Sequence, residues 1–563
     1  MRAFLLLLLS LLAPSARAEK TIVNPAWTAR NTPVVTVDSI LLRDTVSRLY
    51  ITLRQLPHTS MTLHDDWTIQ DSTAHFSGKI RDIDGVDLNR TFQFESDSTI
   101  GVEMDFPAIP TSLTEIDVIG NKGKDEIRII GLSLIRTRER ATGNCISPNS
   151  VSARPKLPDI TFEPDTAVIR GKFSGFHPRL NIPAGKIILN DIFTRQQTEL
   201  TVPIEPDGSF SIKMPTSHPV QQKLWFNDRF IHFYIEPSDT LYIELPIDEL
   251  FAPFRYRGEI EQHCLHLTYQ GKNALINDQL RQIRMQEIAE PEEWIEALNS
   301  LPPHEYYTNE ENKFKEKLEY LNREYRHKKL SQTAYKLSIL NSYYKFLYHL
   351  FVYKDIKDKN ILSEYKNSTN KNIVFANNLY LNDPLSTATE YYIPFLFSIE
   401  SWERMTTPEN WQFPDFKKAL EKRNVILSPS EEEALKFVWG ENKTAPPYVE
   451  QTIQNFNRKY EIEQISMREE KLRTLRNDTY QTYFGSADHF TRQLIDTRMV
   501  IKLIGSLNRK LSDAEVKEFT STITNERLVQ AIVQENSNQQ PESRQVQAGN
   551  ARKNENKNVT LRP

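Results

Sequence analysis

The sequence predicts an α+β multidomain protein, with two N-terminal β-sandwich-like domains followed by an α-helical domain and a disordered C-terminal tail. Apolar and polar residues alternate over much of residues 24–257, which is the period of half-buried strands. From residue 259 to about 534 the apolar spacing becomes helical, and after 534 apolar residues thin out. A chain of 563 residues is also too long for one hydrophobic core, so several domains are expected.

Residues 1–18 are typical of a cleavable signal peptide. Arg2 forms a short basic start, Leu5–Leu12 an almost uninterrupted apolar run, and Ala16-Arg17-Ala18 a small-residue cleavage site. The apolar run is too short to span a bilayer, no later window is long enough, and no Cys follows the run. We therefore expect an exported, periplasmic protein without a transmembrane or lipid anchor.

Residues 19–140 are predicted to form the first β-sandwich. Short alternating runs such as Val35–Ile40, Arg48–Leu53 and Thr91–Phe94 are separated by turn residues. Residues 141–159, rich in Ser, Pro and Asn, are predicted to be an extended linker.

A second β-sandwich is predicted over residues 160–257. Asp207-Gly208 lies between the alternating runs Thr201–Glu205 and Ser209–Ile212, which predicts a tight hairpin turn. Another strand pair is predicted from Leu224–Ile235 and Leu241–Leu245.

An α-helical domain is predicted over residues 258–534. Three helix starts are predicted from capping patterns at Thr308–Glu311, Ser428–Glu431 and Ser512–Glu515, in which a hydroxyl and a carboxylate satisfy free backbone donors. Residues 535–563 are predicted to be a disordered tail, because so polar a segment cannot bury enough surface to offset the entropy of ordering it.

Charge and motif content exclude several function classes. The 70 basic and 74 acidic residues are mixed along the chain, so no global field favours nucleic acid. The sequence has no G-x-S-x-G, Walker-type loop or His-Glu-x-x-His, and 17 Gly leave little material for phosphate-binding loops. We predict no catalytic residue, cofactor site or metal site.

The chain has two cysteines, Cys145 and Cys264, and no Cys-x-x-Cys. An even number in an exported protein permits a disulfide, but the sequence leaves open whether these two are bonded. His263-Cys264-x-His266 is the densest group of metal-capable side chains. No third ligand is identifiable near the two histidines, so we interpret them as ordinary structural residues.

Two further patterns have a structural and a functional interpretation. The acidic clusters Glu431–Glu433 and Glu290–Glu293 resemble paired carboxylates, but both coincide with helix starts, where negative charge is favourable. The aromatic runs Tyr343–Tyr353 and Tyr391–Phe397 are expected in the core. A groove for a peptide or glycan is the alternative, since Tyr is favoured at interfaces.

Four segments together resemble a known family of envelope proteins. They are Val168–Gly171, the turn Asp207–Phe210, Tyr234–Leu241 and Gly271–Asn277. In this order they resemble the β module and following helix that precede the thioredoxin domain of TlpA-like thiol-disulfide oxidoreductases of the Bacteroidetes type.

The resemblance extends to both sides of these segments and has two departures. Residues 24–134 resemble the additional N-terminal β domain of longer members, and Asn382-Asp383-Pro384 leading into Tyr391-Tyr392 resembles a site in the helical spacer. Ser238 stands where the β module usually has Gly, and the Trp-Cys-x-x-Cys of the redox domain is absent. No catalytic residue can therefore be transferred.

The sequence leaves two main functional hypotheses. The first is a non-catalytic envelope protein that serves as a binding or scaffolding module, with a protein or peptide partner. The alternative is an enzyme: a truncated or split thiol-disulfide oxidoreductase whose thioredoxin domain is lost or separately encoded, or a hydrolase whose site matches no known motif. The ligand and the oligomeric state remain open, and a further possibility is that the helical region serves only as an oligomerisation surface.

Overall fold

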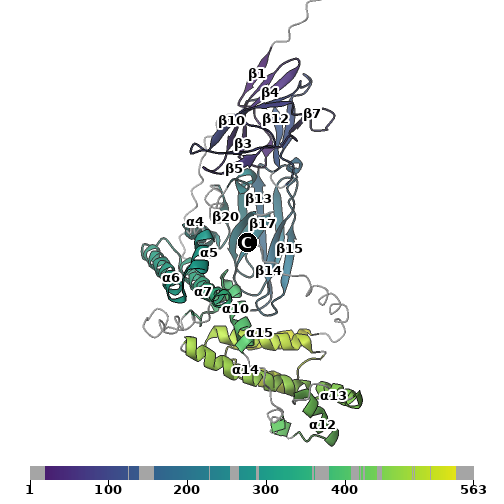
Figure 1. The fold of residues 1–563 in the computed structure, drawn as a ribbon, viewed down its shortest axis with the longest axis vertical. Coiled ribbons are helices and arrows are strands. Elements are labelled where there is room, and N and C mark those ends of the chain that lie inside the picture. Colours follow the sequence, from purple (N-terminus) through teal and green to yellow (C-terminus); the bar gives the residue numbers. More distant parts are fainter. Residues whose placement is uncertain are drawn as a thin grey trace, which may run out of the picture.

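The computed structural model describes residues 19–123, 126–137, 157–226, 229–253, 266–286, 291–357, 361, 380–406, 417–418, 420–421, 425–439, 447–484, 486, 488–507 and 509–539. Within these residues the chain is α+β, with the sheets in the N-terminal half and the helices after them (Figure 1). The predicted signal peptide, both cysteines, and most of the predicted linker and tail lie outside the described residues.

The first β unit contains two five-stranded sheets and a short two-stranded one. The first sheet has the order β1 (Lys20–Val23), β3 (Val35–Leu42), β4 (Val46–Arg54), β10 (Thr99–Pro107) and β8 (Asp82–Asp84). The second has the order β2 (Ala29–Arg30), β12 (Ile127–Ser133), β11 (Glu115–Gly120), β6 (Thr68–Gln70) and β7 (Ser77–Lys79). β5 (Ser60–Thr62) pairs with β9 (Thr91–Gln93).

Alternation along the strands explains how the two larger sheets come together. In β4, Leu49, Ile51 and Leu53 are buried while the residues between them are partly exposed. These side chains share one core cluster with residues of the other sheet such as Val118 and Ile129, so the two sheets contribute to the same core. The predicted runs Val35–Ile40, Arg48–Leu53 and Thr91–Phe94 all contain strands.

The second β unit contains two four-stranded sheets around a core of its own. One has the order β16 (Ser209–Thr216), β13 (Asp165–Ser174), β19 (Thr240–Pro246) and β20 (Thr268–Gln270), with β13 parallel to β19. The other has the order β15 (Gln197–Val202), β14 (Gly185–Asn190), β17 (Val220–Phe226) and β18 (Arg229–Ile235). The short helices η1 (Pro178–Leu180) and α2 (Ile247–Leu250) flank the sheets.

The strand pairings predicted for this unit are wrong, although its turns are where the sequence predicts them. At Asp207-Gly208 the Glu205 carbonyl accepts from the Gly208 amide at 2.8 Å, yet β15 and β16 belong to different sheets. Likewise Leu224–Ile235 contains two strands, β17 and β18, that pair with each other, whereas β19 lies in the opposite sheet. In both places a turn carries the chain between sheets.

Apolar and polar contacts join the two β units. Ala29 and Ile130 of the first unit belong to the core cluster of the second. At the same junction Arg30 forms an ion pair with Asp248 at 2.9 Å, and Arg179 forms one with buried Asp117 at 2.6 Å. The first unit therefore packs on the end of the second (Figure 1).

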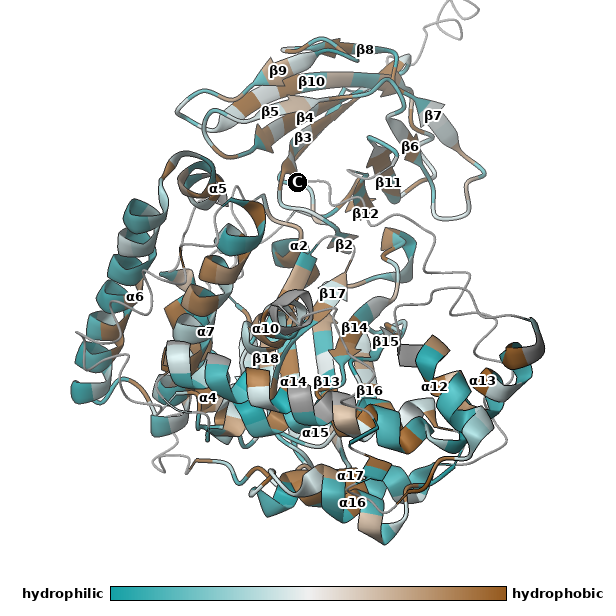
Figure 2. Ribbon diagram, turned by 60° about the horizontal axis from the view of Figure 1, so that its bottom comes forward, coloured by the Kyte–Doolittle hydropathy of each residue, from teal (hydrophilic) through white to brown (hydrophobic). Residues whose placement is uncertain are grey.

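The remaining secondary structure of the described chain is helical. The helices are α4 (Ala274–Met285), α5 (Pro291–Ser300), α6 (Pro303–Arg326), α7 (Gln332–Ile356), η2 (Pro384–Ala388), α10 (Tyr392–Thr406), α12 (Pro429–Trp439), α13 (Pro447–Lys459), α14 (Glu461–Phe484), α15 (Phe490–Ser506), α16 (Asp513–Thr520) and α17 (Glu526–Asn538). α7 is central and packs against α4, α6 and α10. α6, in contrast, is largely hydrophilic along its length (Figure 2).

Two of the three predicted capping patterns start helices. Ser512 caps α16 in a capping box with Glu515, and Ser428 and Glu431 exchange hydrogen bonds at the start of α12. The third pattern is wrong, because α6 already begins at Pro303 and the Thr308 hydroxyl donates to the His304 carbonyl inside the helix. Pro303 occupies the first helical position, where proline is favoured, and therefore marks the start of α6 better than the capping pattern does.

Two predicted domain boundaries also differ from the structure. β20 pairs with β19, so the second β unit extends to Gln270, beyond residue 257. α17 continues to Asn538, so the predicted tail from residue 535 begins inside a helix. None of the described helices combines the length and apolarity needed to span a bilayer.

Candidate functional site

A cavity of about 310 Å³ lies between the second β unit and helices α15 and α17. The β unit contributes residues from the ends of β14, β15 and β16 and from the turns beside them, and the helices contribute Ile501, Ala531, Glu535 and Asn538. Its size is at the lower end of the range for ligand pockets, and it lies at a junction between structural units, where such sites commonly occur.

Asp191 stands on the cavity wall formed by the β14–β15 turn. One of its carboxylate oxygens accepts from the amides of Phe193 and Thr194, at 2.9 and 2.6 Å. This local bonding is typical of Asx turns, and it fixes the exposed carboxylate at the cavity. Next to it the chain buries Ile192, which lines the same cavity.

His218 lies in the turn between β16 and β17 and is buried. Its ring lies 5.8 Å from that of Phe162, and the Thr216 hydroxyl donates to its carbonyl at 2.7 Å. Burial lowers the pKa of His218 to about 4, against a smaller opposing effect of the Asp191 carboxylate. The imidazole is therefore neutral at pH 7.

Helix α17 also contributes to the cavity lining. Leu528 and Ile532 bury one side of the helix, and Asn525 caps its N-terminus by accepting from two backbone amides. Ala531 and Glu535 are four residues apart and therefore share a helix face, which lines the cavity.

The cavity lining combines apolar, uncharged polar and acidic side chains. Its apolar lining includes Phe162, Leu189 and Met214. Its titratable lining residues, apart from His218, are the carboxylates Asp165, Asp191 and Glu535, and no Lys or Arg lines it among the described residues. The cavity thus presents negative charge beside an apolar surface.

A buried ion cluster fixes the β14–β15 turn against the helices. Arg498 of α15 donates to Glu400 of α10 at 2.7 Å and also to the Ile192 carbonyl. Arg195 of the turn lies 2.8 Å from the other Glu400 oxygen. Glu400 and Arg498 are fully buried, so both charges depend on this pairing.

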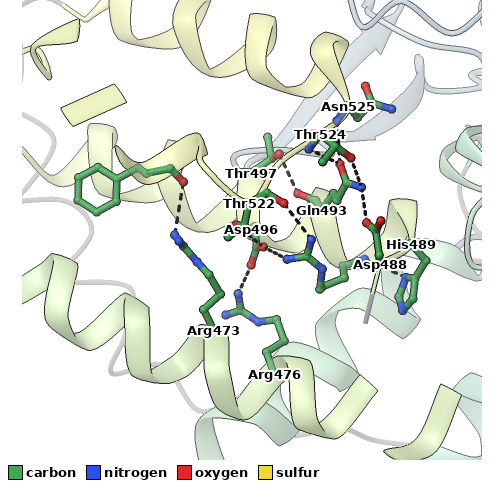
Figure 3. Close-up of polar contacts among 12 residues, drawn as sticks. Arg473, Arg476, Asp488, His489, Gln493, Asp496, Thr497, Thr522, Thr524 and Asn525 are labelled. Carbon is green, nitrogen blue, oxygen red and sulfur yellow. Dashed lines mark hydrogen bonds and ion pairs between the residues drawn. The ribbon is translucent and has the colours of Figure 1, made fainter. Parts of the chain in front are cut away.

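A second polar cluster lies deeper in the helical region (Figure 3). Buried Asp496 accepts from Arg476 of α14 and from Arg492 of its own helix α15. Gln493 accepts from the amides of Thr524 and Asn525, at 2.9 and 2.8 Å. These contacts attach the segment before α17 to α15, so we interpret this cluster as structural.

The segments that carry the family resemblance also meet. Asn277 of α4 forms two hydrogen bonds with the backbone of Tyr234, at 2.6 and 2.9 Å, and Lys272 forms an ion pair with Glu236 at 2.6 Å. Ser238 has a φ of 61°, a left-handed conformation that favours glycine. These residues join β18 and β19 to α4 and do not line the cavity.

The residues that the sequence singled out do not form a site in the described part of the chain. His263, Cys264 and Cys145 lie outside it, and His266 pairs with Glu249 at the surface before β20. No group of three His, Cys, Asp or Glu among the described residues is arranged to hold a metal ion.

The acidic clusters and the aromatic runs, which each have a structural and a functional interpretation, lie where the structural interpretation expects them. α5 begins at Pro291, within one acidic cluster, and α12 begins at Pro429, just before the other, in which Glu431 pairs with Lys459 at 2.7 Å. Most of the aromatic side chains are in the core, including Tyr344, Phe351, Tyr392 and Phe395. The core interpretation of the aromatic runs is thereby confirmed for these residues.

The cavity residues Asp191, His218 and Glu535 are not predicted from the sequence. They come from three segments, and the first and last of these lie more than 300 residues apart in the sequence. Each residue looks like an ordinary turn or helix residue. Only the local turn signal around Asp191 was available. Comparison of the chain with family models, with curated proteins and with solved structures found no match.

Proposed function

We propose that this protein is a non-catalytic, exported envelope protein that acts as a binding or scaffolding module. In this proposal its sheets form two β-sandwich modules that, with the helices, correspond to the accessory region of TlpA-like thiol-disulfide oxidoreductases. The cavity between the second β unit and α17 carries the proposal, because it combines apolar and polar side chains at a junction of units.

The surroundings of the cavity support binding of a partner. The Glu400 and Arg498 cluster holds one part of the lining and the capped helix α17 another, so the cavity is formed before a ligand arrives. A preformed site loses less entropy on binding than one that must be ordered. Residues 1–18 support export, since their pattern is that of a signal peptide.

The test compares partner capture by variants that fill or spare the cavity. Ala531→Trp places a large side chain on the lining face of α17, whereas Val533→Trp places it at an exposed position of the same helix. Envelope proteins retrieved by wild type and by Val533→Trp, but not by Ala531→Trp, are identified and titrated with the purified protein. We expect at least tenfold weaker binding by Ala531→Trp; equal retrieval by all three would contradict the proposal.

The resemblance also supports the alternative of a split oxidoreductase. An insulin-reduction assay distinguishes it: we expect no turnover, since a lone thiolate without a resolving partner cannot complete the exchange cycle. Turnover by the purified chain, or a separate thioredoxin-domain protein among the captured partners, would favour the alternative. Recovery in the cytoplasmic fraction would contradict export.

A further inference from the structure

We propose that the cavity accepts a lysine or arginine side chain carried by an extended peptide segment of a partner protein. This inference rests on the proposed binding function and names the chemistry of the occupant. Three features of the cavity carry it: the negative charge of its lining, the apolar side chains in that lining and the strand edge beside it.

The charge of the cavity lining favours a cation. Asp191 lies on the β14–β15 turn and Glu535 on α17, so two different elements each contribute a carboxylate to the lining. Asp165, at the start of β13, adds a third. With no lining Lys or Arg in the described chain, and with His218 neutral, nothing on the walls balances this charge. A ligand cation would balance it.

The apolar part of the lining favours a long side chain over a compact ion. Leu189, Val220 and Ala531 are partly exposed lining residues, and their apolar surface is suited to methylene groups. Lys and Arg carry apolar stems that pack along such surfaces while the charged end stays among polar groups. A small hydrated cation has no group that would use this lining.

The strand beside the cavity favours an extended peptide. Thr198, a lining residue, belongs to β15, which is the end strand of its sheet in the described chain. An extended segment can add to such an edge through main-chain hydrogen bonds, with alternate side chains entering pockets. A basic residue in that segment would then reach the carboxylates while its neighbours lie along β15.

The test measures binding of a labelled probe peptide by fluorescence anisotropy. The probe is a nine-residue peptide of alternating Val and Lys, and the matched probe has Glu in place of Lys. We expect the Lys probe to bind the full chain at least about tenfold more tightly than the Glu probe, and its binding to weaken with added salt. Equal binding of both probes, or no binding of the Lys probe, would overturn the proposal.

Variants locate the binding on the cavity. Glu535→Gln and Asp191→Asn should each weaken binding of the Lys probe by about five- to tenfold. The Asn side-chain oxygen can still accept hydrogen bonds from the Phe193 and Thr194 amides, so the turn is preserved. Glu526→Gln, the same substitution at the other end of α17, should change affinity less than about twofold. Equal effects of Glu535→Gln and Glu526→Gln would place the peptide elsewhere and overturn the proposal.

Two further outcomes identify other occupants. Lysine amide that binds as tightly as the peptide would make the site one for a small cation. A carbodiimide crosslink from Glu535 to Lys553 or Lys557 of the same chain would make the chain's own C-terminal segment the occupant. Either outcome overturns this inference. If cavity filling still abolished partner capture, the proposed binding function would stand and only the occupant would be wrong.

Discussion

Gly208 illustrates how a single backbone angle is decided by its neighbours. Its φ is 83°, and a Cβ at this position would lie 2.4 Å from the Phe173 carbonyl oxygen and 2.9 Å from the Phe176 Cβ. The Gly208 carbonyl also accepts from the Phe173 amide at 2.9 Å, so this turn is held against β13. The requirement for glycine therefore comes from the left-handed conformation and from a close backbone approach together.

We expect Gly208→Val to lower the free energy of unfolding by more than about 2 kcal/mol, because it adds left-handed strain and a clash with backbone. Ser209→Ala is the control, since it removes only the exposed hydrogen bond from Ser209 to Asp207 and should cost about 0.5 kcal/mol. Urea unfolding measures both, with a lower midpoint and an unchanged slope expected for Gly208→Val. Equal midpoints for the two variants would show that the turn tolerates a side chain.

At the scale of elements, similar sequence patterns have different outcomes. The Ser512 hydroxyl accepts from the Glu515 amide, and the Glu515 carboxylate accepts from the Ser512 amide at 2.7 Å, so this pattern starts α16. Thr308 is followed by the same kind of acidic residues but lies inside α6, where Glu310 and Glu311 are buried. A capping residue acts only where the helix has free amides to satisfy.

We expect Ser512→Ala to lower the free energy of unfolding by about 1 kcal/mol, because α16 loses its cap. Thr308→Ala should be neutral or slightly stabilising, since Ala is the better residue in a helix interior. Urea midpoints of the two variants give the comparison. A larger loss at Thr308 than at Ser512 would mean that the Thr308 side chain has a role that its bond to His304 does not explain.

At the scale of the whole molecule, buried charges join the second β unit to the helical region. Glu400 lies between Arg498 and Arg195, on three different elements. Glu400→Gln should lower the free energy of unfolding by about 3–5 kcal/mol, because it leaves guanidinium groups buried without their counter-charge. Exposed Glu163→Gln is the matched control and should be neutral. Calorimetry should show the loss, and an unchanged transition for Glu400→Gln would contradict the role of the cluster.

Acid should destabilise the whole molecule through its buried histidines. Burial lowers the pKa of His489 to about 3, with a smaller effect of the Arg492 charge. Because this folded-state pKa lies below the unfolded value of about 6.5, the unfolded state binds more protons as the pH falls below 6.5, and the folded state loses stability. At neutral pH, which lies above both pKa values, His489 is neutral in both states and this loss of stability disappears.

A substitution of His489 tests the predicted loss of stability at low pH. Its Nδ1 accepts from the Arg492 amide at 3.2 Å as the cap of α15, and Asn can replace it as a cap without titrating. Between pH 7.5 and pH 5 we expect His489→Asn to lose about 1–2 kcal/mol less stability than wild type. Exposed His327→Asn is the control and should follow wild type. Identical pH dependence of all three proteins would show that His489 is not buried as a neutral group.

The sequence by itself determined that strands are followed by helices along the chain, and where several turns and helix starts lie. These features depend on residues within a few positions of one another: alternation along β4, the left-handed glycine at Gly208 and the capping box at Ser512. The positions of such features are therefore readable without knowledge of the fold.

Only the tertiary structure decided which strands share a sheet and which residues line the cavity. It placed β15 and β16 in different sheets on the two sides of a correctly predicted turn, because a tight turn constrains its own backbone but not the sheet that each strand joins. It likewise brought Asp191, His218 and Glu535 to one cavity from turns and a helix with no common sequence pattern. Burial and long-range packing, which no local spacing encodes, set both the charge of that cavity and the neutrality of its histidine.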